Sequence, residues 1–96
     1  MNPLIETATA DGVLRLAGSL DIYGAEPLRT TLLARFGEAS EVTVDLAGVE
    51  QCDTAGLQLL VSARRKANAS SRVLRYTNVS DAVRACCRSL GLPENL

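Results

Sequence analysis

The sequence of 96 residues has no histidine and no tryptophan, and its aromatic residues are two tyrosines and one phenylalanine. Without histidine, a metal site would need carboxylates or thiolates alone, and these do not cluster along the chain. With so few aromatic side chains, the sequence also lacks the stacking platforms on which single strands and RNA bases are bound. We therefore expect neither a metal site nor nucleic-acid binding.

The chain also has no strong excess of one charge and no long apolar run. Ten basic and eleven acidic residues are mixed along the chain and leave a formal charge of −1, so the overall field attracts polyanions weakly. No apolar run approaches the roughly twenty residues of a membrane span. The start "MNPLIETATADG" has neither the basic residues nor the apolar core of a signal peptide. These features predict a cytoplasmic protein with no membrane insertion.

Three cysteines are present, and their spacing does not match a zinc site. Cys52 stands alone and is expected to be buried at the end of a strand. The neighbours Cys86 and Cys87 lie inside a helical pattern, and we interpret them as core and boundary positions rather than as a redox pair. With 47% apolar and 22% charged residues, the composition is that of an ordinary folded chain. At this length it predicts one domain over residues 1–96.

The first part of the chain predicts a hairpin. Two short segments of alternating apolar residues are separated by Asp11-Gly12, which is among the strongest short hairpin signals. We expect antiparallel strands near residues 3–9 and 13–18.

From Tyr23 the apolar period becomes helical. The residues on one helical face are Ala25, Leu28, Leu32 and Phe36. They predict a helix over about 25–36, with Asp21 capping or preceding its start, Pro27 in its first turn and Gly37 just past its end.

The remaining elements follow from similar patterns. "EVTVDLAGV" predicts a buried strand near 41–47, and "RVLRYTN" predicts another near 72–77. Between them, a second helix follows the Asp53 region, and its apolar face has Leu57, Leu60, Val61, Arg64 and Ala67. Ser80 caps a third helix, which Gly91 and Pro93 stop.

These patterns predict an α/β fold with the element order β-β-α-β-α-β-α. The two strand-helix-strand crossovers should be right-handed and should build a small mixed sheet of four strands, with about three helices mainly on one face. The Asp53 region then lies where a strand ends and a helix begins.

That region, "QCDTAGLQLLVSARRKA" at residues 51–67, is the candidate site. Either Asp53 or Thr54 is expected to cap the helix. The unpaired amides from Thr54 to Leu57 and the positive end of the helix dipole favour an oxyanion or a phosphate. Gly56 costs about a kilocalorie of helix propensity relative to alanine, and we interpret it as clearance for the backbone of a partner.

Catalysis is not indicated at this position. Thr54 has no histidine to activate it, and the adjacent Asp53 does not form a nucleophile-base pair with it. "AGLQ" lacks the lysine and the spacing of a phosphate-binding loop, so we expect no nucleotide hydrolysis and no cofactor. The basic run Arg64-Arg65-Lys66 is interpreted as a solvated helix end that complements the dipole. Ile22 and Tyr23 beside Asp21 either anchor a partner or pack onto the sheet.

Three stretches together are similar to a known family. They are "LAGSLDIYGAEPLRTTLL", "VTVDLAGVEQCDTAGLQLLVSARRKA" and "LRYTNVSDAVRACCRSLGL". In this order, and over nearly the whole chain, they resemble the STAS domain of bacterial anti-sigma factor antagonists. The most specific part is an aspartate, a hydroxyl residue, a small residue, a glycine and a leucine after a "V-D-L" strand.

The resemblance implies a non-enzymatic switch. In that family, a partner serine/threonine kinase with a GHKL-type ATPase fold, itself an anti-sigma factor, phosphorylates the hydroxyl residue after the aspartate, and a phosphatase removes the phosphate. Carried over, Thr54 is the phosphorylation site. The partner-binding residues are then Asp21, Asp53, Thr54, Ala55, Gly56 and Leu57.

The sequence departs from the antagonists at two of these positions. Antagonists usually have serine as the acceptor and a second hydroxyl residue after it, whereas this chain has Thr54 and Ala55. "DTAGLQLL" also resembles small subunits that stabilise the ATPase of bacterial lipid-transport ABC complexes, and adaptors of chemosensory pathways that bind a chemosensory kinase. These uses stay open as alternatives.

Overall fold

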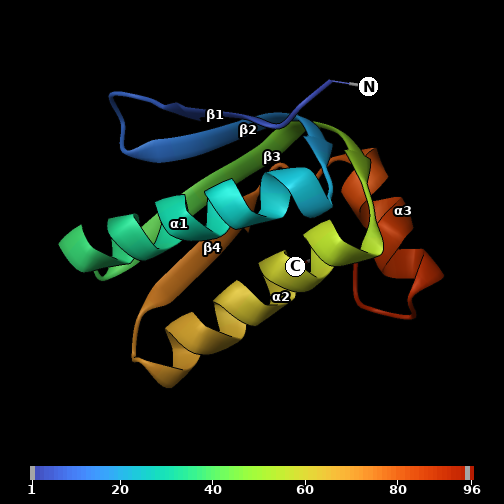
Figure 1. Cartoon of the computed structure of the whole chain (residues 1–96). Coiled ribbons are helices and arrows are strands. Elements are labelled where there is room, and N and C mark those ends of the chain that lie inside the picture. The colour runs from blue at the N-terminus through green and yellow to red at the C-terminus, as the bar shows by residue number, and fades with distance from the viewer. Residues whose placement is uncertain (1, 95) are drawn as a thin grey trace.

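The computed structural model describes residues 2–94 and 96, and its seven elements follow one another in the predicted order (Figure 1). They are β1 (Ile5–Ala8), β2 (Val13–Leu20), α1 (Ile22–Glu38), β3 (Glu41–Cys52), α2 (Thr54–Ala69), β4 (Val73–Thr77) and α3 (Asp81–Ser89). The β-β-α-β-α-β-α order is thereby confirmed, and the hairpin turn passes through Gly12 at a φ of 83°.

The four strands form one mixed sheet in the order β1-β2-β3-β4. β1 is antiparallel to β2, and the other two neighbouring pairs are parallel, as predicted. Figure 1 shows α1 and α2 side by side over one face of the sheet. The pairing of β3 with β4 ends at Asp45 and Thr77, and α3 packs against β3. α1 directly follows β2 and α2 directly follows β3. Because these two strands are parallel, both large helices start at the same edge of the sheet.

Alternate residues of the strands face the helices and form the core. The fully or nearly fully buried side chains of the sheet include Leu14, Leu16, Val42, Val44, Leu46, Leu74 and Tyr76, and those of the two large helices include Leu28, Leu32, Leu57, Leu60 and Ala67. The Tyr76 hydroxyl donates to the Leu60 carbonyl over 2.7 Å. The Arg64 guanidinium lies over the Tyr76 ring, 4.8 Å from its centre, and so covers this part of the core.

The bounds predicted for the first helix were wrong at both ends. α1 begins at Ile22, because the Asp21 carboxylate accepts hydrogen bonds from the amides of Tyr23 and Gly24 over 3.0 and 3.1 Å. Pro27 consequently lies in the second turn rather than the first. The helix continues to Glu38 and includes Gly37, which was expected just past the end.

The third strand is also longer than predicted. β3 does not stop near residue 47 but continues to Cys52, because β2 pairs with it as far as Leu20 and Cys52. The apparent turn residue Gly48 lies inside the strand, where an added Cβ would stand 2.7 Å from the Leu16 carbonyl oxygen. The close approach of the two strands at this irregular point of the pairing thus requires glycine.

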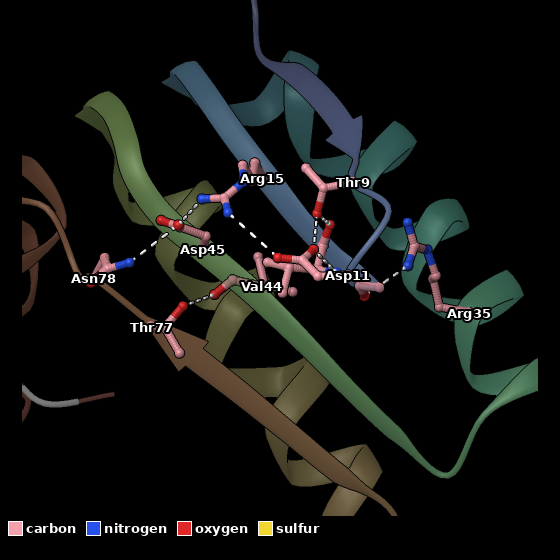
Figure 2. Close-up of polar contacts among 10 residues, drawn as sticks. Thr9, Asp11, Arg15, Arg35, Val44, Asp45, Thr77 and Asn78 are labelled. Atoms are coloured by element: carbon pink, nitrogen blue, oxygen red, sulfur yellow. Dashed lines mark hydrogen bonds and ion pairs between the residues drawn. The ribbon is translucent and has the colours of Figure 1, made fainter.

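A buried carboxylate joins three strands on the face of the sheet opposite to α1 and α2 (Figure 2). Asp45 is 6% exposed and accepts from the Arg15 guanidinium over 2.6 Å, from the Asn78 amide over 3.1 Å and from the Ala47 backbone N–H over 2.8 Å. Arg15 belongs to β2, and Asn78 directly follows β4. The network holds the strands together just before β3 extends toward the candidate site.

Candidate functional site

The starts of α1 and α2 lie next to each other at one edge of the sheet. Leu20 and Cys52 end two parallel strands and are paired in register. The next residues, Asp21 and Asp53, are the N-caps of α1 and α2. The structure therefore brings Asp21 to the same edge as Asp53, and the two positive helix ends share that edge.

Asp53, and not Thr54, caps α2. Its carboxylate accepts from the Gly56 amide over 2.9 Å, and its backbone amide donates to the Leu20 carbonyl over 3.1 Å. Thr54 is the first residue of the helix and is exposed. Because Asp53 caps the helix, the Thr54 hydroxyl is not needed to start it. Thr54 is therefore accessible from solvent without loss of the cap.

The six residues predicted to bind a partner differ in their exposure. Asp53 and Thr54 are exposed and Asp21 and Ala55 are half-buried, whereas Gly56 and Leu57 are buried. The Leu57 side chain has no exposed surface and packs in the core. This corrects its expected place on the partner surface, because the helical phase that exposes Thr54 turns Leu57 toward the sheet.

Gly56 does not provide clearance for the backbone of a partner, as the sequence had suggested. An added Cβ at this position would stand 2.3 Å from the carbonyl oxygen and 2.7 Å from the Cγ of Leu20. The space beside Gly56 is therefore filled by β2 of the same chain, and the glycine allows α2 to start close to the sheet.

Leu90 and Leu92, which the sequence did not assign to the site, line the same surface hollow as Ala55, the neighbour of Thr54. A surface hollow next to the helix starts is lined by Ile22, Ala55, Leu59, Leu90 and Leu92, among others. Ile22 is 63% exposed and Tyr23 is 85% exposed, which decides the open question of their packing in favour of exposure. The available sequence signal was the pair of leucines flanking Gly91 after the third helix. We call Asp21, Ile22, Tyr23, Asp53, Thr54, Ala55, Leu90 and Leu92 the helix-start surface.

The cysteines close to this surface are packing residues. Cys87 is fully buried and Cys86 is half-buried, which confirms their interpretation as core and boundary positions. Cys52 is half-buried rather than buried. Burial, with a smaller contribution from the adjacent Cys86 thiol, raises the pKa of Cys52 to about 12. Burial also raises the pKa of Cys87. Thiols that stay protonated near neutral pH are poor nucleophiles.

We expect Cys52 to resist alkylation in the folded protein. At about pH 8, iodoacetamide should modify it roughly a hundredfold or more slowly than in the denatured chain, because only the thiolate reacts. The folded-state pKa of Cys52 lies above the unfolded value, so this thiol contributes stability to the fold. The contribution is fully present below the ordinary thiol pKa of 9.0 and is lost as the pH rises toward about 12. Site-resolved mass spectrometry after timed labelling measures the rate. Equal rates in folded and denatured protein would contradict the burial of this thiol.

Within residues 2–94 and 96, no three or more cysteine, aspartate or glutamate side chains gather in a way that would hold a metal ion. No helix there has both the length and the apolar character needed to cross a bilayer.

Comparison with known proteins agrees with the fold. Residues 4–96 match the family described as "Mlab, STAS domain". The anti-sigma-B factor antagonist of Staphylococcus epidermidis is 33% identical over 86 residues, which are 86% of this chain and 80% of that protein. The chain belongs to the STAS-domain family, and its relatives there include anti-sigma factor antagonists.

Solved structures show the same fold. The unphosphorylated anti-sigma factor antagonist SpoIIAA aligns over 93% of this chain and 81% of its own with a TM-score of 0.68 and 17% identity. The crystal structure of Mglu aligns over 76% of this chain and 19% of its own with a TM-score of 0.60 and 22% identity. The predicted STAS-like fold is therefore confirmed.

Proposed function

We propose that this protein is a non-enzymatic antagonist of an anti-sigma factor. Its partner is a serine/threonine kinase with a GHKL-type fold, which binds the helix-start surface, and phosphorylation of Thr54 releases it. The observation that carries the proposal is the placement of Thr54: an exposed hydroxyl at the first position of α2, directly before Ala55, which lines a surface hollow together with the exposed Ile22 and Leu90. The antagonist relatives support this function.

The proposed switch acts through charge rather than through refolding. A phosphate on Thr54 adds about −1.5 to −2 charges to a surface that already has Asp21 and Asp53. The positive end of the α2 dipole favours that charge within the chain, so the domain keeps its fold. The added charge repels acidic groups of a partner that packs against the same apolar residues, and the hydrated phosphate prevents close apolar contact between the two proteins.

We expect Thr54→Ala to bind the proposed GHKL-type kinase with the affinity of the wild type and Thr54→Glu to bind it at least about tenfold more weakly. Isothermal titration calorimetry with purified proteins in ADP measures both. Thr30→Glu is the matched control, because Thr30 is an exposed threonine on the outer part of α1 that does not line the hollow at the helix starts. It should bind like the wild type.

The phosphorylation itself has a separate readout. After incubation with the kinase and ATP, mass spectrometry should find phosphate on Thr54, and Thr54→Ala should acquire none. Equal kinase affinity of all three variants, or a phosphate at another residue, would overturn the proposed switch.

A second candidate is a constitutive subunit that stabilises the ATPase of a lipid-transport ABC complex. Ala55 favours it, because the hollow beside Thr54 is lined by a small apolar residue where antagonists usually have a second hydroxyl. In this case Thr54→Ala and Thr54→Glu bind the ATPase equally well, and adding the protein raises the melting temperature of the ATPase.

A further inference from the structure

A second hollow lies between the later halves of α1 and α2, away from the caps at Asp21 and Asp53. Its apolar lining consists of Leu32, Leu33 and Phe36 from α1 and Leu59, Ala63 and Ala67 from α2. Leu33 is 57% exposed, although it belongs to this lining. The hollow has a volume of about 330 Å³. We call it the α1-α2 groove. Phe36, Leu59 and Ala63 are half-buried, so together with Leu33 they present apolar surface to water.

Every charged residue that lines this groove is basic. Arg29 comes from α1, Lys66 from α2, and Arg72 from the turn before β4, and no acidic residue takes part in the lining among the residues described. None of the three forms an ion pair within residues 2–94 and 96. Arg72 donates to the Ala39 carbonyl over 3.4 Å and lies 6.0 Å from the centre of the Phe36 ring. An apolar floor with a basic rim selects a ligand that is both apolar and acidic.

The shape of the groove favours a helix over a small molecule. On α2 the lining extends from Leu59 to Ser70, which spans about 16 Å at 1.5 Å per residue, or about three helical turns. Of the lining residues, only Leu32 and Ala67 are buried, so the groove is open to water along its length. A small ligand would leave one side of its apolar body wet, whereas an amphipathic helix keeps its polar face in water.

We infer that the α1-α2 groove binds an acidic amphipathic helix of a protein partner. Apolar residues at positions i, i+4 and i+7 of that helix pack on Leu33, Phe36 and Ala63, and carboxylates beside them meet Arg29, Lys66 and Arg72. The groove shares Leu59 and Ser62 with the hollow at the helix-start surface, so one partner can reach both. The inference does not depend on phosphorylation of Thr54.

The test uses two capped peptides of about sixteen residues with the same leucines at helical spacing, one with glutamates and one with lysines on the flanks. Titration into ¹⁵N-labelled protein is followed by amide chemical shifts. We expect the acidic peptide to produce saturable shifts at Leu33, Phe36 and Ala63, with an affinity that falls as salt rises. The basic peptide should produce none.

Variants assign the binding to the groove. Lys66→Glu and Arg29→Glu should each weaken the acidic peptide at least about tenfold, and Leu33→Asp should do the same by charging the exposed apolar lining. Arg65→Glu is the matched control, because Arg65 is the neighbour of Lys66 on α2 but lines the other hollow. It should bind the acidic peptide like the wild type, as should Thr54→Glu, which separates this test from that of the proposed switch.

Several results would overturn the inference. They are equal binding of both peptides, shifts confined to the helix-start surface, or an unchanged affinity in Lys66→Glu and Arg29→Glu. Saturation of the groove by dodecanoate below its micellar concentration, without binding of the acidic peptide, would make it a site for an anionic amphiphile instead. A dimer in sedimentation velocity that Leu33→Asp dissociates would show that a second copy of the chain covers the groove.

Discussion

Replacing Gly56 with alanine should destabilise the domain by about 2 kcal/mol, even though alanine is the better helix former by about 1 kcal/mol. The added Cβ would stand 2.3 Å from the carbonyl oxygen of Leu20 and 2.8 Å from its carbonyl carbon. Both are backbone atoms at the end of a central strand, so no side-chain rotation relieves the contact. Either α2 or the end of β2 must move, and core contacts of the first turn are lost with the shift.

Gly37→Ala is the matched control for this variant. Gly37 also lies inside a helix, but nothing stands within 4 Å of a Cβ added there. It should therefore stabilise the domain by up to about 1 kcal/mol through helix propensity alone. Urea unfolding followed by circular dichroism compares the two. If Gly56→Ala were as stable as Gly37→Ala, close packing of α2 on Leu20 would not be what requires the glycine.

The second large effect is expected at Asp45. Asp45→Ala should lower the free energy of unfolding by about 2 kcal/mol, because it removes a carboxylate that is 6% exposed and accepts from the Asn78 amide and the Ala47 backbone N–H, and it leaves Arg15 only the exposed Asp11 at 3.7 Å. Asp45→Asn should cost nearly as much, since an amide that accepts from Ala47 directs its own N–H groups toward the donors of Arg15 and Asn78.

Another ion pair of the same sheet provides the control. Glu41 accepts from Arg75 over 2.6 Å, the distance also found between Asp45 and Arg15, but the Glu41 and Arg75 side chains are 54% and 61% exposed. Glu41→Ala should therefore cost less than about 1 kcal/mol, because water screens the pair. Urea unfolding of both variants measures the difference. Equal losses would mean that the burial of Asp45 contributes nothing beyond an ordinary surface pair.

Much of the fold was predictable because the signals are local. Asp11-Gly12 marks the hairpin, and the change of apolar period after Tyr23 marks the first helix. The order of strands and helices then restricts the topology to a small mixed sheet. The predicted bounds of helices and strands were wrong where a specific hydrogen bond or pairing with a distant strand sets the end of the element. Capping by Asp21 moved the start of α1, and pairing with β2 carried β3 on to Cys52.

In the candidate site, too, some features follow from neighbouring residues of the sequence and others only from packing of distant segments. The placement of Asp53 and Thr54 at a strand end and a helix start follows from their own neighbours in the chain. That Leu90 and Leu92 line the same hollow as Ala55 could not be predicted, because these two leucines come from the last part of the chain and reach the site through packing of α3. The burial of Leu57 depends equally on how α2 rests on the sheet.

By itself the sequence determined the family, the order of elements and the position of the hydroxyl at Thr54, because periodicity, turn residues and a short motif act over a few neighbouring residues. Only the tertiary structure decided that Asp53 is the cap, that Gly56 makes room for Leu20, and that an apolar groove with a basic rim lies between α1 and α2. These depend on contacts between segments far apart in the chain, and their distances are set when the helices pack on the sheet.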